Sequence, residues 1–103
     1  MVIYDIALKT PLGRKSGELV VSNENGKLSG FLSLLGHTEP IEGIVEENGK
    51  CSLKGTFVTL LNTICFTADG VINGEVLNLK IRSGSGTYEM VGALRRGKES
   101  DRQ

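Results

Sequence analysis

His37, the only histidine in this 103-residue chain, is the side chain best suited to acid–base or metal chemistry. Glu39 and Glu42 follow it closely. A catalytic triad would also need a nucleophile and an orienting partner, and a zinc site would need three or four ligands. Neither set surrounds His37 in the sequence. We therefore interpret it as an exposed turn histidine and expect no catalytic residue and no metal site.

Two further motifs resemble parts of known active sites. The segment 83–86, Ser-Gly-Ser-Gly, looks like a phosphate-binding loop, but 87–90 alternates like a strand, whereas a phosphate loop leads into a helix. The pair Glu46-Glu47 precedes Asn48-Gly49 and has no apolar surroundings that would raise a carboxyl pKa, as glycoside hydrolysis requires. We predict a hairpin turn and a charged turn, no cofactor, and a protein that is not an enzyme.

The elements that carry these residues are predicted by turn signals of two alternating kinds. Asn-Gly or Asp-Gly between apolar residues is a strong hairpin signal, because both turn positions need a positive φ. The other kind opens with Thr or Ser and closes with Gly or Asn, typical of a type I or II turn. The first kind is Asn25-Gly26, Asn48-Gly49 and Asp69-Gly70; the second is Thr10–Gly13, Ser33–Gly36, Thr59–Asn62 and Ser83–Gly86. Seven turns predict eight strands, at 2–9, 14–22, 27–34, 38–45, 50–59, 63–67, 71–82 and 87–95.

Glycines also recur inside the strands, in the pattern apolar-x-Gly-x-apolar. Because side chains alternate between faces, each such glycine shares the inner face with its apolar neighbours. Sharply coiled strands or a close backbone approach would explain them, and a small closed barrel requires both. The glycines are Gly30, Gly43, Gly55, Gly74 and Gly92.

The predicted inner face carries no charge, and two tyrosines are its main polar groups. An eight-stranded barrel is either filled by side chains or holds one small ligand, and the sequence leaves both open. If the barrel closes, Tyr4 and Tyr88 could meet inside as polar anchors for a mostly apolar ligand, since buried hydroxyls need partners. The predicted ligand-binding residues are Tyr4, Tyr88, Phe57, Phe66, Met90 and Thr59. The other predicted inner residues are Val2, Ile6, Leu8, Leu19, Val21, Leu28, Leu32, Ile41, Val45, Leu53, Ile64, Ile72, Val76 and Leu94.

In the seventh predicted strand the apolar residues switch from one face to the other, which leaves two interpretations. Ile72 and Val76 share one face, but Leu77, Leu79 and Ile81 share the other. A β-bulge near Val76-Leu77 would turn the second set inward. Otherwise that set faces outward and joins Phe31, Ile44, Val58 and Val91 in an apolar band, which would mark a subunit interface. We expect a homo-oligomer, with a dimer as the commonest closed form.

Cysteine usage, terminal sequence and charge indicate the compartment of the protein and the classes of partner it could bind. Cys51 and Cys65 lack C-x-x-C spacing and fall on opposite strand parities, so we expect two buried free thiols. The amino terminus lacks a secretory pattern and no apolar run could span a membrane, which favours the cytoplasm and no membrane partner. A net charge of zero and few aromatic residues argue against nucleic-acid binding.

With the turns identified, the chain resembles an uncharacterised bacterial family of small calycin-like (lipocalin- or streptavidin-style) β-barrels. The matching residues are Thr10-Pro11-Leu12-Gly13, then Asn25-Gly26-Lys27-Leu28-Ser29-Gly30, and Asp69-Gly70-Val71-Ile72-Asn73-Gly74. Later copies depart from the pattern, with Leu60 and Gly84 in place of Pro. The resemblance implies a barrel and transfers no catalytic residue.

We therefore predict an all-β, antiparallel, eight-stranded up-and-down meander that closes, or nearly closes, into a small calycin-like barrel. An open β-sandwich is the alternative. The barrel domain covers residues 1–95, and 96–103 is a charged, flexible tail. The predicted function is non-catalytic binding of a small, mostly apolar ligand inside the barrel. The alternative is a homo-oligomeric interaction module with a filled barrel and no ligand.

Overall fold

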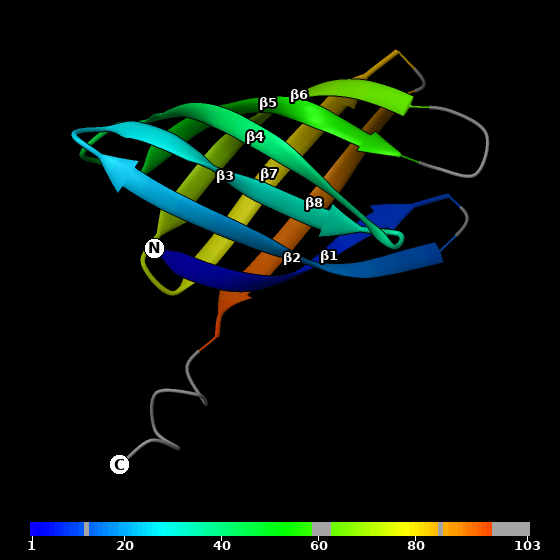
Figure 1. Cartoon of the computed structure of the whole chain (residues 1–103), viewed down its shortest axis with the longest axis horizontal. Helices are drawn as coiled ribbons and strands as arrows, with labels where there is room; N and C mark the ends of the chain where they lie inside the picture. The colour runs from blue at the N-terminus through cyan, green and yellow to red at the C-terminus, as the bar shows by residue number, and fades with distance from the viewer. Residues whose placement is uncertain (12, 59–62, 85, 96–103) are drawn as a thin grey trace.

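Eight antiparallel strands form a closed barrel in chain order (Figure 1). The computed structural model describes residues 1–11, 13–58, 63–84 and 86–95. The strands are β1 (Val2–Thr10), β2 (Gly13–Glu24), β3 (Lys27–Leu34), β4 (His37–Val45), β5 (Lys50–Val58), β6 (Thr63–Asn73), β7 (Val76–Ser83) and β8 (Gly86–Leu94). Closure comes from β1 and β8, which pair from Tyr4 opposite Leu94 to Lys9 opposite Glu89. The predicted closed meander is confirmed, and the open sandwich is wrong.

The two kinds of turn lie at opposite ends of this barrel, because each strand reverses the direction of the one before it. The turns after β2, β4 and β6 lie at one end, on the left of Figure 1, together with Met1 and Arg95. We call it the Asn-Gly end. The turns after β1, β3 and β7 lie at the other, which we call the Thr/Ser end. The predicted turn Thr59–Asn62 and the predicted tail 96–103 fall outside the described residues.

Side chains cap turns at both ends. Asn25 and Gly26 have φ of 56° and 91°, the positive values that a tight hairpin requires. The side-chain oxygen of Asn23 accepts a hydrogen bond from the Gly26 N–H at 2.9 Å. At the Thr/Ser end, the Thr10 hydroxyl donates to the carbonyl of Gly13 at 2.7 Å. Because these hydrogen bonds form between residues close in sequence, the residue types alone could predict these turns.

One predicted turn is wrong. Asp69-Gly70 lies inside β6, and the chain reverses at Gly74-Glu75, where Gly74 has a φ of 75°. Gly70 is required for another reason: a Cβ on it would overlap the carbonyl oxygen of Asn78 on β7. The glycine therefore permits a close backbone approach rather than a turn. Gly74 is correspondingly a turn residue and not one of the inner strand glycines.

The displaced turn resolves the phase change in β7. Leu77, Leu79 and Ile81 face inward and are 1–2% exposed, so the outward interpretation is wrong. No bulge is needed, because the strand starts at Val76, after the turn. Val76 itself is 51% exposed and faces outward, contrary to its predicted inner position, whereas Val2 shares the face of Tyr4 and is 40% exposed because it lies at the open end of the barrel.

Leucine and isoleucine fill the middle of the barrel. Leu19, Leu32, Leu77, Leu79 and Ile81 have the largest fully buried side chains, and they come from β2, β3 and β7. The other buried hydrophobic residues are Tyr4, Ile6, Leu8, Val21, Leu28, Leu34, Ile41, Cys51, Leu53, Phe57, Phe66, Ala68 and Met90. Among the described residues, the middle of the barrel is therefore packed with apolar side chains.

The pairing of β4 with β5 is shorter than that of the other neighbouring strands. It runs from Ile41 opposite Gly55 to Val45 opposite Cys51, so among the described residues 38–40 have no partner on β5. Pro40 lies where this pairing stops, and proline has no N–H to donate to a neighbouring strand. The two strands diverge toward the Thr/Ser end (Figure 1).

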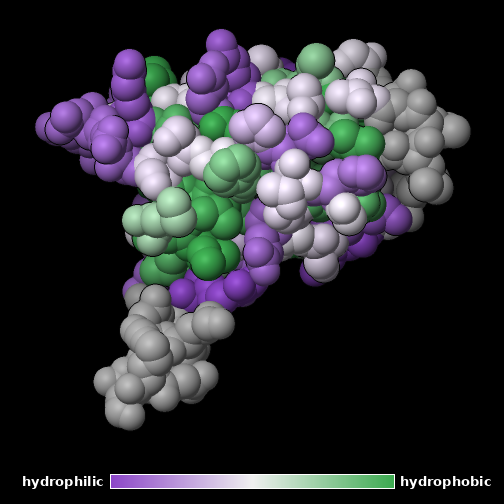
Figure 2. Space-filling model, in the orientation of Figure 1, coloured by the Kyte–Doolittle hydropathy of each residue, from purple (hydrophilic) through white to green (hydrophobic). Residues whose placement is uncertain are grey.

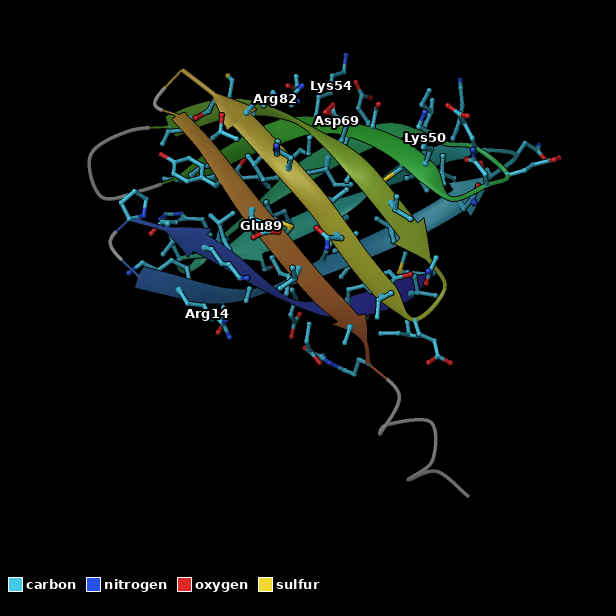
Figure 3. All side chains as sticks on the ribbon, turned by 180° about the vertical axis from the view of Figure 1, so that it is seen from behind. Arg14, Lys50, Lys54, Asp69, Arg82 and Glu89 are labelled. Atoms are coloured by element: carbon cyan, nitrogen blue, oxygen red, sulfur yellow. The ribbon has the colours of Figure 1, made fainter. Side chains whose placement is uncertain are left out.

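Charged residues cover the outside of the barrel, and several side chains point away from it in Figure 3. Arg82 pairs with Asp69 at 3.1 Å and Lys54 with Glu42 at 3.3 Å. Arg95, just after β8, pairs with Asp5 on β1 and, at 2.7 Å, with Glu18 on β2. Its hydrogen bond lowers the pKa of Asp5. This cluster spans the seam where β8 meets β1.

The cysteines differ from the expectation in one respect. Both thiols are free, but Cys51 is buried and Cys65 is exposed. Cys65 alternates with Phe66, whose side chain is inside, so its own side chain is outside. Among the described residues, no helix is long and apolar enough to cross a membrane.

Candidate functional site: a pocket at the Asn-Gly end

A pocket of about 660 Å³ opens at the Asn-Gly end of the barrel. Its floor is the end of the apolar core, and its rim is made by the turns after β2, β4 and β6. The floor residues are Tyr4, Val21, Leu28, Val45 and Ile72; the rim residues are Asn23, Glu46, Glu47, Asn48 and Asn73. The apolar area at the lower left of Figure 2 lies at this end, beneath the hydrophilic tip of the β2–β3 hairpin. The volume is within the range of small-molecule sites.

Tyr4 is the main polar group of the floor. Its side chain is 3% exposed, and its hydroxyl donates a hydrogen bond to the carbonyl of Gly74 at 2.7 Å. Burial, and to a lesser extent the nearby Cys51 thiol, raise the pKa of this phenol. Tyr4 therefore stays neutral at physiological pH, and its oxygen can still accept a hydrogen bond from another donor.

Cys51, also in the interior, is unreactive at neutral pH. Burial raises the pKa of its thiol to about 11, and the charge of Asp69 adds to the effect. Only the thiolate is an effective nucleophile or metal ligand, so at neutral pH this side chain acts as a small apolar group.

Backbone hydrogen bonds hold the rim turns against one another. The N–H of Val45 donates to the carbonyl of Gly26 at 2.8 Å, and the N–H of Ile72 donates to the carbonyl of Gly49 at 2.9 Å. The side-chain oxygen of Asn48 accepts a hydrogen bond from the N–H of Lys50 at 3.0 Å. The mouth of the pocket is therefore built in advance and does not have to order when a ligand arrives.

The five predicted ligand-binding residues that the structure describes do not form one site. On β8, Leu94 is opposite Tyr4, whereas Tyr88 lies six positions away, opposite Ile81 of β7. The two tyrosines are therefore at opposite ends and their rings do not meet. Tyr4 alone lines the pocket at the Asn-Gly end. Thr59 falls outside the described residues.

The remaining three predicted residues belong to the packed core. Phe57 and Phe66 are 5–6% exposed, and their ring centroids are 5.7 Å apart with an interplanar angle of 40°. Such a tilted pair stabilises packing beyond its buried area. Met90 is 3% exposed and lies opposite Leu8 and Leu79. Of the three, Phe66 also lines a groove beside Pro40, away from the pocket at the Asn-Gly end.

The residues whose types suggest acid–base or phosphate chemistry do not lie together. His37 is exposed at the start of β4, at the Thr/Ser end, and Glu46 and Glu47 are exposed at the other end. The Ser83–Gly86 segment joins β7 to β8 as the predicted hairpin, and the Ser83 hydroxyl donates to the carbonyl of Gly86 at 3.2 Å. Within the described part of the chain, no group of three His, Cys, Asp or Glu side chains could hold a metal ion.

Sequence reasoning missed the rim asparagines Asn23 and Asn73. Both precede turns at the same end of the barrel as Asn48. Because each strand reverses the direction of the one before it, every second turn lies at the same end of the barrel. The alternation of the two kinds of turn could therefore have predicted that these asparagines share one end.

No protein-family model matches the sequence, and no curated protein is detectably similar to it. Among solved structures, the chain is similar to a redesigned β-barrel, mFAP1, determined bound to DFHBI. The TM-score is 0.66 at 13% sequence identity, and the match covers 92% of this chain and 93% of the other. At this identity the likeness supports the fold alone, an eight-stranded antiparallel barrel.

Proposed function

We propose that this protein binds a small, mostly apolar molecule in the pocket at the Asn-Gly end, without catalysis. The proposal rests on one observation: a pocket of about 660 Å³ has an apolar floor that adjoins a fixed polar rim. Ligand sites typically combine these features. The similar barrel mFAP1 was solved with a small molecule bound, which adds support at the level of the fold.

The site differs from the one expected in the sequence. Because leucine and isoleucine fill the middle of the barrel, the ligand rests on the core rather than within it. Tyr4 is the polar group at the base of the ligand, and Tyr88 takes no part because it is at the other end.

The test is a titration with 1-naphthylmethanol, a neutral apolar probe with one hydroxyl. Binding should raise the melting temperature with ligand concentration, and amide NMR shifts should concentrate near Tyr4, Val21 and Ile72. Tyr4→Phe should weaken binding, while Tyr88→Phe is the matched control and should not. An unchanged melting temperature together with unmoved NMR signals would refute the proposal.

A second function, assembly into a homo-oligomer, is supported by apolar side chains on the outer face. Phe31 is 49% exposed, Ile44 55% and Val76 51%. Light scattering at micromolar concentration should report a mass above the 11.1 kDa of one chain, and Phe31→Ser should reduce it. A strict monomer would leave the pocket as the functional site.

We further propose that the protein acts in the cytoplasm and belongs with the small bacterial calycin-like barrels. Two free cysteines, one of them exposed, suit a reducing compartment. The confirmed meander suits the barrel architecture of that family.

A further inference from the structure

A row of apolar side chains crosses the outside of four neighbouring strands. The register places Ile3 on β1 opposite Val20 on β2, Val20 opposite Phe31 on β3, and Phe31 opposite Pro40 on β4. Their neighbours along each strand are core residues, so alternation directs these four side chains outward. Phe31 is 49% exposed, whereas the other two phenylalanines are buried. The row therefore presents one aromatic side chain to solvent.

The row ends at an apolar groove on the outside of the barrel. The groove has a volume of about 530 Å³ and lies beside Pro40, where the pairing of β4 with β5 stops. Two buried core residues, Ile41 and Phe66, contribute to its lining, and so do the exposed Cys65 and Thr67 on β6. An exposed aromatic side chain and a groove of a size to accept one thus lie next to each other on the same face.

The charges beside the groove compensate each other within the chain. Glu42 and Lys54 both line it and form an ion pair at 3.3 Å. No other charged side chain is among the described residues that line it. Two copies of this face can therefore meet without like-charge repulsion, whereas a strongly charged partner would find no unpaired charge of opposite sign.

The positions of Phe31 and the groove suit a two-fold axis. They lie on opposite sides of Pro40, because β4 separates β3 from β5 in the barrel. Rotating a second copy by 180° about an axis perpendicular to the surface near Pro40 places its Phe31 over the groove of the first copy. The same rotation places Phe31 of the first copy over the groove of the second. Such a reciprocal contact closes a dimer and leaves neither surface free to bind a third copy.

We propose that this face is the interface of a two-fold dimer, in which the Phe31 side chain of each copy inserts into the groove beside Pro40 of the other. The inference rests on the proposed assembly into a homo-oligomer and names its interface. It assigns no contact to Ile44 or Val76, which are also exposed but do not line this groove.

The mass in solution tests the interface. Light scattering at micromolar concentration should report about twice the 11.1 kDa of one chain for the wild type. Phe31→Ser removes the inserted side chain and Thr67→Trp fills the groove, so each variant alone should be monomeric. Ile44→Ser is the matched control, because Ile44 is 55% exposed outside this face, and it should stay dimeric.

Mixing the variants distinguishes insertion from a general loss of apolar surface. An equimolar mixture of Phe31→Ser and Thr67→Trp restores one of the two contacts, because the intact groove of the first accepts Phe31 of the second. Its mass should rise above that of either variant alone. Cys65 supplies a second readout, since its thiol lines the groove. Its reaction with a thiol reagent should slow several-fold as the wild-type concentration rises, and should not slow in Phe31→Ser.

Three results would overturn the inference: a dimer that persists in Phe31→Ser, a dimer that is lost in Ile44→Ser, or a mixture that stays monomeric. Each of them leaves the homo-oligomer itself standing, with its interface elsewhere. A wild-type chain that is strictly monomeric would overturn both.

Discussion

The hydroxyl of Tyr4 donates a hydrogen bond to the carbonyl of Gly74, a residue seventy positions further along the chain. This hydrogen bond joins β1, near the closing seam of the barrel, to the turn between β6 and β7. It therefore ties the floor of the pocket to its rim, across strands that are not neighbours in the sheet.

Tyr4→Phe should destabilise the fold by about 0.5–1.5 kcal/mol, because a partly buried carbonyl loses its partner while the ring still fills its space. Urea unfolding followed by circular dichroism measures the change. Tyr4→Leu is a useful comparison, since it loses ring packing as well and should cost more. An unchanged midpoint in Tyr4→Phe would show that water replaces the hydroxyl without cost.

Cys51 should make stability fall in alkaline solution. Its thiol has a pKa of about 11 in the fold against an ordinary value of 9.0, so unfolding releases a proton between these two values. The contribution is complete below pH 9 and is lost as the pH rises toward 11. Cys51→Val should flatten this decline, whereas Cys65→Val, at an exposed position, should not. Equal pH slopes for the wild type and Cys51→Val would contradict the assignment.

The two thiols should also react at different rates. A thiol reagent added to the native protein should modify the exposed Cys65 promptly and the buried Cys51 only on unfolding. Titration in denaturant without reductant should count two thiols. Prompt modification of both would place Cys51 outside the core.

Gly70→Ala should be strongly destabilising, by on the order of 1–3 kcal/mol, because the new methyl group overlaps the carbonyl of Asn78. Gly84→Ala is the matched control: a Cβ there meets nothing within 4 Å. Thermal melts compare the two. Equal tolerance of both changes would mean that β6 and β7 are further apart at this point than their register requires.

Leu35→Asn should stabilise the protein by about 0.5–1 kcal/mol. Leu35 has a φ of 57° in the turn after β3, a left-handed conformation that is costly for leucine and tolerated by asparagine. The side chain is 42% exposed, so little packing is lost. Leu35→Ala keeps the conformational cost and should bring no gain. A lower melting temperature for Leu35→Asn would show that the leucine makes contacts that outweigh its strain.

The strands were predictable wherever the signal was local. Asn25-Gly26 is a turn because of its own backbone preferences, and the alternation on either side places Leu28 and Val21 inside. Gly70 was misread because the reason for it lies across the sheet, in the approach of β7. A glycine that permits a turn and one that permits a close contact look alike in a sequence.

The site was only partly predictable for a related reason. Alternation correctly placed Tyr4 inside, but the partner of Tyr4 on β8 depends on the stagger of the strands around the barrel. The stagger is set by how the whole barrel closes, so the sequence of either strand alone does not reveal it. The same stagger separates Tyr88 from the pocket.

The short pairing between β4 and β5 determines where this barrel opens most easily. Local opening begins where backbone hydrogen bonds are fewest, and among the described residues this junction lacks partners for 38–40. If it parts, the remaining junctions leave a single continuous sheet running from β5 through β8 and β1 to β4. Phe66, a buried core side chain, lines the groove beside Pro40 at this junction. Because the pairs from Gly43 opposite Leu53 to Val45 opposite Cys51 hold the junction at the Asn-Gly end, we expect opening to start at the Thr/Ser end and to leave the rim intact.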